Sequence, residues 1–275
     1  MKYRYFLYCF IVLLTFHSVA VYANLLISPT RIAFDDRQRV AKVIVVNNSN
    51  ESKTYRLEWQ EKVAKPQGGY ITLTDDQVNP NSLASMMRLS PSQVRLAPGE
   101  RQVVKIALRK AKGLADKEYR SHLVFKALPN EHKSNSKSFG IRLDMVLSYS
   151  IPVILRQGTA LPEVDIASVK YLTNDAKPSL GISLNHSGDY SSFGKVEVFQ
   201  TLSGSKEEQK IAMVNDFSIY PELDNVTLTL PLFDNMKLQE NSQIRITYSG
   251  LKEYQGQVFS TKTTTFTSQH FNSLQ

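Results

Sequence analysis

Short apolar-rich segments, separated by polar turn-forming stretches, follow one another along the chain after residue 24. The segments hold many β-branched and aromatic residues, which favour strands, and no window keeps the period of an amphipathic helix. The clearest are residues 25–34, 41–48, 55–63, 102–108 and 122–128, and in the second half 165–172, 179–186, 194–202, 226–232, 242–249 and 257–267. The pattern predicts an all-β protein.

The polar stretches between these segments have the composition of turns. Residues 47–52 (NNSNES), 66–69 (PQGG), 96–100 (LAPGE) and 133–138 (KSNSKS) are rich in Asn, Gly, Pro and Ser, which adopt turn conformations readily. Residues 157–162 (QGTALP) divide two series of strands. Because one immunoglobulin-like sandwich takes about 100 residues, we expect two antiparallel β-sandwich domains, at 24–156 and 163–275.

One long apolar segment is unusual for a strand in a sandwich. From residue 141 onward, Ile141, Leu143, Met145 and Leu147 alternate with Arg142, Asp144 and Val146, and the segment continues through Pro152 to Arg156. Alternation puts the large apolar side chains on one face of a strand. The pattern is typical of an ordinary half-buried strand, and equally of a strand that offers an apolar face to a partner.

The first 23 residues predict a cleaved secretion signal. Lys2 and Arg4 precede an apolar run at 6–14, and Val21 and Ala23 fit the small residues of a signal-peptidase site. A membrane anchor needs about 20 apolar residues, whereas polar residues interrupt this run at positions 15, 17 and 18. No second run of that kind follows, so we expect a secreted protein that is not embedded in a membrane.

Cysteine content and charge narrow the setting further. Cys9, the only cysteine, lies in the signal segment, so the mature domains rest on hydrophobic cores without disulfides, which suits a bacterial periplasm. Loss of Lys2 and Arg4 lowers the formal net charge from +8 to +6, because residues 1–23 contain no acidic residue. This moderate excess can attract an acidic partner, but no block of Lys and Arg favours nucleic acid.

Patterns that carry catalysis or metal binding are absent from the sequence. The five histidines are scattered without the close spacing of zinc ligands, and no nucleophile-elbow, Walker or dinucleotide-binding pattern occurs. The pairs Asp35-Asp36 and Asp75-Asp76 fit solvated turns, because adjacent strand side chains point to opposite faces. A triad assembled from distant strands is defined only in space. The sequence predicts a binding protein with no enzymatic activity and no cofactor.

Four motifs, taken in order, resemble one family. They are SPTRIAF (28–34), SQVRLAPGERQVVKIAL (92–108), EYRSHLVFKALP (118–129) and the strand that ends in YSIPVILR (149–156). Together they resemble the first domain of periplasmic pilus-assembly chaperones of the chaperone–usher pathway, and the YSIP stretch is more similar to the non-classical, archaic branch. The second series of strands is similar to that family's second domain. The resemblance implies two immunoglobulin-like sandwiches set at an angle, as in a boomerang.

The same resemblance implies a function. A pilus subunit is a sandwich that lacks its last strand, and its open groove and unpaired edges promote aggregation. The chaperone lends a strand to that groove and delivers the subunit to an outer-membrane usher. Main-chain hydrogen bonds and alternate side chains fill the groove. Leu143, Met145 and Leu147 match the donor residues, and Ile141 extends the set.

Two basic residues of the family bind the C-terminal carboxylate of the subunit. Arg31 matches the first, and its planar guanidinium suits a carboxylate. Pro152 stands where a lysine is expected and cannot carry a charge. Arg120 is the candidate replacement, and a different arrangement of the anchor is the alternative.

Two more positions match an ion pair at the domain junction, which fixes the angle between the sandwiches more than it stabilises them. These are Glu118 and Arg156, and Glu253 is a candidate acidic partner from the second domain.

Two other classes of function stay open. A structural pilus or surface component should begin with its own alternating extension and span one incomplete domain. A carbohydrate-binding or hydrolytic β-sandwich should show clustered aromatic residues or paired carboxylates. The sequence instead shows two apparently complete sets of strands, and it shows no aromatic cluster and no paired carboxylate site.

Overall fold

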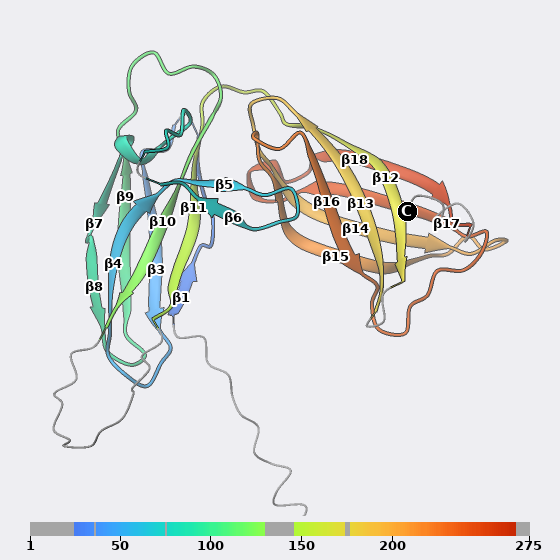
Figure 1. Ribbon diagram of the computed structural model, residues 1–275, viewed down its shortest axis with the longest axis horizontal. Helices are drawn as coiled ribbons and strands as arrows, with labels where there is room; N and C mark the ends of the chain where they lie inside the picture. Colours follow the sequence, from blue (N-terminus) through green and yellow to red (C-terminus); the bar gives the residue numbers. More distant parts are fainter. Residues whose placement is uncertain (1–24, 36, 75, 130–145, 174–176, 268–275) are drawn as a thin grey trace, which may run out of the picture.

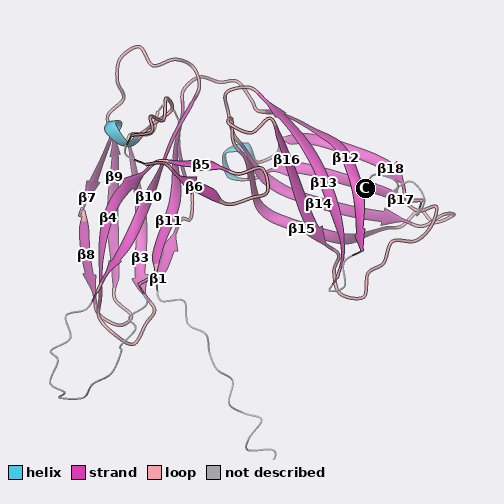
Figure 2. Ribbon diagram, in the orientation of Figure 1, coloured by secondary structure: helices cyan, strands magenta, loops and turns pink. Residues whose placement is uncertain are grey.

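The computed structural model describes residues 25–35, 37–74, 76–129, 146–173 and 177–267. These residues form β-strands almost throughout, with two short 3₁₀ turns, η1 (Ala84–Met86) and η2 (Lys252–Tyr254) (Figure 2). The prediction of an all-β fold is confirmed.

The first domain is a sandwich of two sheets. One sheet has the order β1 (Leu25–Ser28), β3 (Val40–Asn47), β9 (Arg101–Leu108) and β7 (Met87–Ser90). The other has the order β2 (Ile32–Phe34), β11 (Ser148–Arg156), β10 (Glu118–Leu128), β4 (Lys53–Gln60) and β8 (Gln93–Leu96). Alternate residues of each sheet point inward, as Val43 and Val45 of β3 show, and form one core between the sheets.

Strand β10 departs from this alternation, because eight successive residues from Glu118 to Phe125 are buried. Tyr119, Leu123 and Phe125 pack into the first core. Glu118 and Arg120, on either side of Tyr119, point to the opposite face. The second domain covers this face. The outer face of this sheet is therefore the base of the domain interface.

The second domain is also a sandwich. One sheet has the order β12 (Glu163–Thr173), β13 (Pro178–Ser187) and β16 (Asn225–Pro231). The other has the order β15 (Glu208–Ile219), β14 (Ser192–Thr201), β17 (Gln243–Gly250) and β18 (Val258–Thr265). Residues such as Ile182, Val196 and Ile246 are fully buried between them. The two sandwiches of immunoglobulin type agree with the prediction, and their strands run in clearly different directions, so that the molecule is bent (Figure 1).

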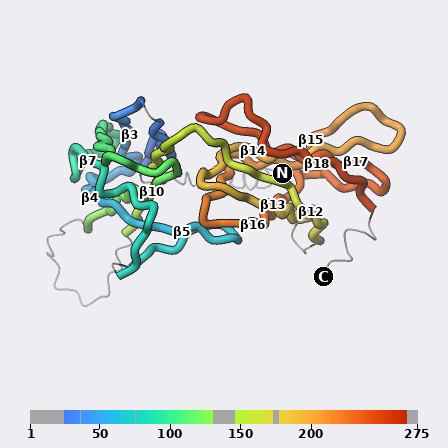
Figure 3. Tube along the Cα trace, turned by 90° about the horizontal axis from the view of Figure 1, so that it is seen from above, coloured from blue at the N-terminus to red at the C-terminus, as the bar shows by residue number. Residues whose placement is uncertain are grey.

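A short hairpin connects the two domains in space. Strands β5 (Lys62–Ala64) and β6 (Tyr70–Thr72) form a sheet of their own, which leaves the first domain after β4 and reaches the second domain (Figures 1 and 3). Its turn includes Gly68 and Gly69, both with positive φ (91° and 76°), a conformation that favours glycine. Ala64 is buried in the core of the second domain.

Candidate functional site

Strand β11 has one fully paired edge and one edge that is mostly free. On one side it pairs with β10 from Ser148 to Arg156. On the other side it pairs in parallel with β2, but only over Val153–Leu155. Within the described part of the chain, residues 148–152 therefore have unpaired backbone groups along that side. Pro152, which lacks an N–H, lies on this edge, where proline is tolerated.

The side chains of β11 alternate between the first core and the opposite face. Tyr149, Ile151 and Val153 pack on the first core, and a further step of two residues leads to Leu147. Leu147 lies just before the strand, and 46% of its surface is exposed. The other predicted donor residues, Ile141, Leu143 and Met145, lie outside the described residues.

The free edge of β11 leads to Arg31. Because Val153 pairs with Ile32 in the parallel register, Arg31 stands at the next position back, beside Pro152. A strand added along residues 148–152 would be in line with β2 and would have to end before Ile32. The sequence Thr30-Arg31-Ile32 thus places an arginine where an added strand must stop.

The guanidinium of Arg31 is buried and held by the second domain. Its Nε and Nη2 donate to Oε1 of Glu253 at 3.3 and 3.0 Å, and Nη2 also donates to Oγ of Ser191 at 3.3 Å. The ring of Phe193 lies 4.7 Å from its central carbon. Its Nη1 is buried and has no hydrogen-bond partner. A buried donor on a cation without a partner is costly, so this atom favours an anionic ligand.

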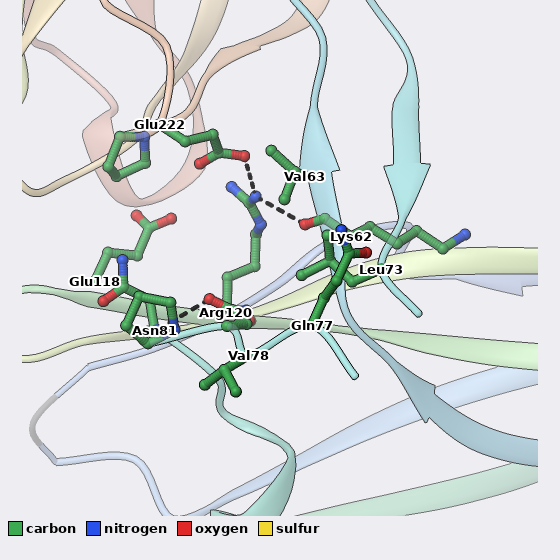
Figure 4. A pocket seen from close by; sticks show the side chains of 12 residues that line it. Lys62, Val63, Leu73, Gln77, Val78, Asn81, Glu118, Arg120 and Glu222 are labelled. Atoms are coloured by element: carbon green, nitrogen blue, oxygen red, sulfur yellow. Dashed lines mark hydrogen bonds and ion pairs between the residues drawn. The ribbon is translucent and has the colours of Figure 1, made fainter. Parts of the chain in front are cut away.

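Arg120 pairs with Ile154, two residues from Pro152, and so lies on the same face of the sheet as Arg31. Its guanidinium already has partners (Figure 4). Its Nη2 donates to the backbone oxygen of Lys62 at 3.2 Å and forms an ion pair with Glu222 of the second domain. Its guanidinium also lies over the ring of Tyr220, 3.8 Å from the ring centre. Arg120 lines a cavity of about 460 Å³ that Arg31 does not line.

Glu118 connects the domains through Ser191. Its Oε2 accepts hydrogen bonds from the backbone N–H of Ser191 at 2.9 Å and from its hydroxyl at 2.6 Å. Its Oε1 is buried without a partner, and Glu118 lines the same cavity as Arg120. Ser191 is fully buried. Because its hydroxyl also accepts from Arg31, this one residue of the second domain contacts both Glu118 and Arg31.

Arg156 faces Glu118 across β10 and β11, but no ion pair joins these two side chains among the described residues. Nη2 of Arg156 donates to the backbone oxygen of Ala160 at 2.8 Å, and its guanidinium lies 4.6 Å from the ring centre of Tyr254. Both residues do lie at the domain junction. Each contacts the second domain separately, and Glu253 pairs with Arg31 instead.

The hairpin adds contacts that the sequence did not indicate. The hydroxyl of Tyr70 donates to that of Tyr220 at 2.9 Å, and the backbone N–H of Ala64 donates to Glu222 at 2.8 Å. The ring of Tyr70 also packs edge-on against His122, 4.7 Å away. Burial and the nearby cations Arg120 and Lys62 lower the pKa of His122 to about 3, so this histidine is neutral near pH 7.

The residues that the structure describes also bear on metal binding and on membrane spans. No group of three or more His, Cys, Asp or Glu side chains there is arranged to hold a metal ion. No helix in the described ranges is long and apolar enough to cross a membrane.

Residues 24–158 match the model of a family described as pili and flagellar-assembly chaperone, PapD N-terminal domain. This first domain belongs to the pilus-assembly chaperone family. The match contains all four motifs that carried the resemblance, together with the free edge of β11, Arg31 and Arg120. The predicted family is confirmed, and the archaic branch stays a prediction. No curated protein sequence was found to match the chaperone.

Several solved structures are similar to the chaperone over most of its length. The YadV chaperone is 14% identical, with a TM-score of 0.42, and the match covers 89% of this chain and 100% of that chain. The Pseudomonas aeruginosa CupB2 chaperone is 14% identical, with a TM-score of 0.45 and coverage of 87% and 98%. The CsuC–CsuE chaperone–tip adhesion subunit complex from archaic Csu pili of Acinetobacter baumannii is 12% identical, with a TM-score of 0.43. The match covers 88% of this chain and 98% of that chain.

Proposed function

We propose that this chaperone binds pilus subunits by adding its own strand to the incomplete sandwich of the subunit. The observation that carries the proposal is the free edge of β11 at residues 148–152, which ends beside Arg31 where β11 begins to pair with β2. A subunit strand paired with residues 148–152 satisfies its own open edge and that of β11 together.

The direction of the bound strand follows from the chemistry of its end. The strand has to stop at Arg31, so a chain terminus fits there and a continuing chain does not. Nη1 of Arg31 is the unpaired donor at this point, and a C-terminal carboxylate is the terminus that it can bind. The subunit strand then runs parallel to β11, with its last residue in the cleft between the domains.

The predicted donor residues supply the apolar part of the interaction. Leu147 shares a face with Tyr149 and Ile151, and in the complex Ile141, Leu143 and Met145 continue the same alternation into the groove of the subunit. Each buried side chain of this size contributes about 1.5–3 kcal/mol, before the loss of freedom on binding is subtracted. Charges at two of these positions would therefore remove most of the affinity.

Arg31 is the carboxylate anchor of this proposal, and Arg120 has a different role. Because Glu222, the backbone of Lys62 and the ring of Tyr220 already surround its guanidinium, Arg120 holds the domains at their angle. Its assignment as a second anchor stays a prediction that requires Glu222 to move away. Glu118 and Arg156 contribute to the same junction.

The setting of this activity is the periplasm, as the family and the predicted signal segment support. The chaperone delivers its subunit to an outer-membrane usher, and no catalytic step or cofactor is needed. The complex supplies the missing strand until another subunit replaces it. No observation favours the structural or carbohydrate-binding alternatives.

The test is capture of a subunit by the intact chaperone in the periplasm. Candidate pilus subunits carry an N-terminal affinity tag, so that their C-terminal carboxylate stays free, and are co-expressed with the chaperone. We expect wild-type chaperone to co-purify, and the double variant Leu143→Glu/Met145→Glu to stay folded but fail to bind. The matched control, Arg142→Glu/Asp144→Lys, changes charge on the opposite face and should keep binding. Equal capture by both variants would refute strand donation.

A further inference from the structure

A cavity of about 610 Å³ opens where the free edge of β11 ends. The first domain contributes Thr30, Arg31 and Pro152, so the cavity begins at the point that the proposed subunit strand reaches. The second domain and the tip of hairpin β5–β6 form its other walls. The cavity therefore lies next to the predicted carboxylate anchor and beyond the donor strand.

The inner wall of this cavity is apolar. Phe193, Tyr220, Leu223 and Val226 of the second domain line it and are almost fully buried, and the partly buried Phe217 and Leu228 continue the surface. Exposed polar residues such as Asp216 lie at its rim. An apolar surface with a polar rim and a few fixed polar groups is typical of a small ligand pocket.

Arg31 is the buried charged group of this pocket, whereas Lys65, which also lines it, is exposed. Only 5% of the surface of Arg31 is exposed, and its Nη1 has no hydrogen-bond partner. Glu253, Ser191 and the ring of Phe193 hold the remaining guanidinium atoms in place. The pocket thus combines one oriented cation with an apolar wall, which is the complement of a single amino-acid residue that ends in a carboxylate and carries a large apolar side chain.

We infer that this pocket selects pilus subunits by their last residue and prefers a large apolar or aromatic side chain there. The inference rests on the proposed function, because the carboxylate at Arg31 fixes where that side chain begins. The pocket volume accommodates any amino-acid side chain, so selection comes from the apolar area buried. A terminal glycine would leave the wall formed by Phe193 and Leu223 open to water.

Hairpin β5–β6 is what turns the open cleft into a pocket. Ala64 anchors the hairpin in the second core, and Tyr70 binds Tyr220, so the hairpin stands across from Arg31 as a third wall. Its tip at Gly68 and Gly69 carries no side chains, and a Cβ added at Gly68 meets nothing within 4 Å. The base of the hairpin is therefore fixed, and Lys65 and Gln67 line the pocket at its turn.

The experiment uses three small probes on the purified full chain: N-acetyl-L-phenylalanine, N-acetylglycine and N-acetyl-L-phenylalaninamide. Dissociation constants come from NMR chemical-shift titrations. We expect the phenylalanine acid to bind at least about tenfold more tightly than N-acetylglycine, from the burial of its side chain. The amide should bind more weakly than the acid, because it lacks the charge that pairs with Arg31.

Two exposed threonines give a matched pair of variants. Thr229→Trp places an indole at the pocket, and Thr263→Trp on β18 does not line it. The first should abolish the advantage of the phenylalanine side chain, and the second should leave it unchanged. Loss of the advantage only in Thr229→Trp supports the inference.

The contrary outcomes separate this inference from the proposed function. If both acids bind equally and more tightly than the amide, the side-chain pocket is refuted and the carboxylate anchor stands. If acid and amide bind equally, the anchor at Arg31 fails, and the pocket inference fails with it. Binding of no probe, or equal effects of the two tryptophan variants, also overturns the pocket inference.

Discussion

Ser191 of the second domain gives both its backbone N–H and its hydroxyl to one carboxylate oxygen of Glu118 in the first domain, at 2.9 and 2.6 Å. Both residues are buried. Bonds from neutral donors to a buried carboxylate are stronger than ordinary ones, and these two cross the domain junction. The same hydroxyl oxygen accepts a bond from Arg31, so the geometry of the anchor and the fixation of the domains depend on one serine.

Replacement of this serine should destabilise the protein. Ser191→Ala removes one hydrogen bond to the buried Glu118 carboxylate, and we expect a loss of about 1.5–3 kcal/mol in the free energy of unfolding, measured by urea titration. Ser187→Ala is a matched control, because the Ser187 hydroxyl donates to Glu163 at 3.0 Å in an exposed place. The control should lose less than about 0.5 kcal/mol. Equal losses would mean that the buried position adds nothing.

Removal of Glu222 should loosen the angle between the domains. Glu222 accepts from Arg120 and from the backbone N–H of Ala64. Glu222→Ala therefore removes the ion pair of Arg120, which keeps only its bond to the backbone oxygen of Lys62, and takes away the acceptor of the Ala64 N–H. We expect a broader distribution of interatomic distances in small-angle X-ray scattering, with an unchanged circular dichroism spectrum. In the control Glu208→Ala, which breaks a pair with Arg245 inside the second domain, the scattering should stay as in wild type.

Strand content was predictable because it depends on local pattern, but the sheet to which each segment belongs was not. Residues 25–34 were expected as one strand and form two, β1 and β2, in different sheets. Pro29 lies between them and has no N–H for a ladder. Residues 55–63 likewise divide into β4 and β5, since the chain leaves the first sheet at Glu61 to begin the hairpin.

The candidate site was only partly visible in the sequence, because half of it depends on the second domain. Glu118, Arg120 and His122 alternate with residues of the first core, a pattern that is typical of a solvent-facing strand side. Glu118 contacts Ser191, Arg120 contacts Glu222 and His122 contacts Tyr70. These partners are distant in sequence and carry no motif. Arg31 and the β11 segment were identified through the resemblance, and the hairpin with Tyr70 gave no signal beyond the turn at 66–69.

A side chain at Gly250 should displace the turn that carries Glu253. A Cβ at this position would overlap the backbone oxygen and Cβ of Tyr254, the last residue of η2. Gly250→Ala should therefore lower the free energy of unfolding by about 2 kcal/mol or more, in urea titrations. In Gly181→Ala, the added Cβ would lie 3.4 Å from Leu172 Cδ1, an ordinary contact, and the loss should be smaller. Similar losses in both variants would contradict this account of the turn.

His122 should make the protein less stable in mild acid. Its folded pKa is about 3, because burial, Arg120 and Lys62 disfavour the charged ring, whereas the unfolded value is about 6.5. Between these values the unfolded chain binds more protons than the folded chain, so stability falls as the pH drops from about 6.5 toward 3.

The variant His122→Leu removes the titrating ring and places an apolar side chain beside Tyr70. From pH 7 to pH 5, the histidine accounts for a loss of about 2 kcal/mol in the free energy of unfolding by this linkage. Urea titrations at both pH values should therefore show a smaller loss in the variant than in wild type, by about that amount. An equal loss would mean that the His122 ring titrates with the same pKa in the folded and unfolded proteins. Burial beside Arg120 would then not hold the ring neutral at pH 5.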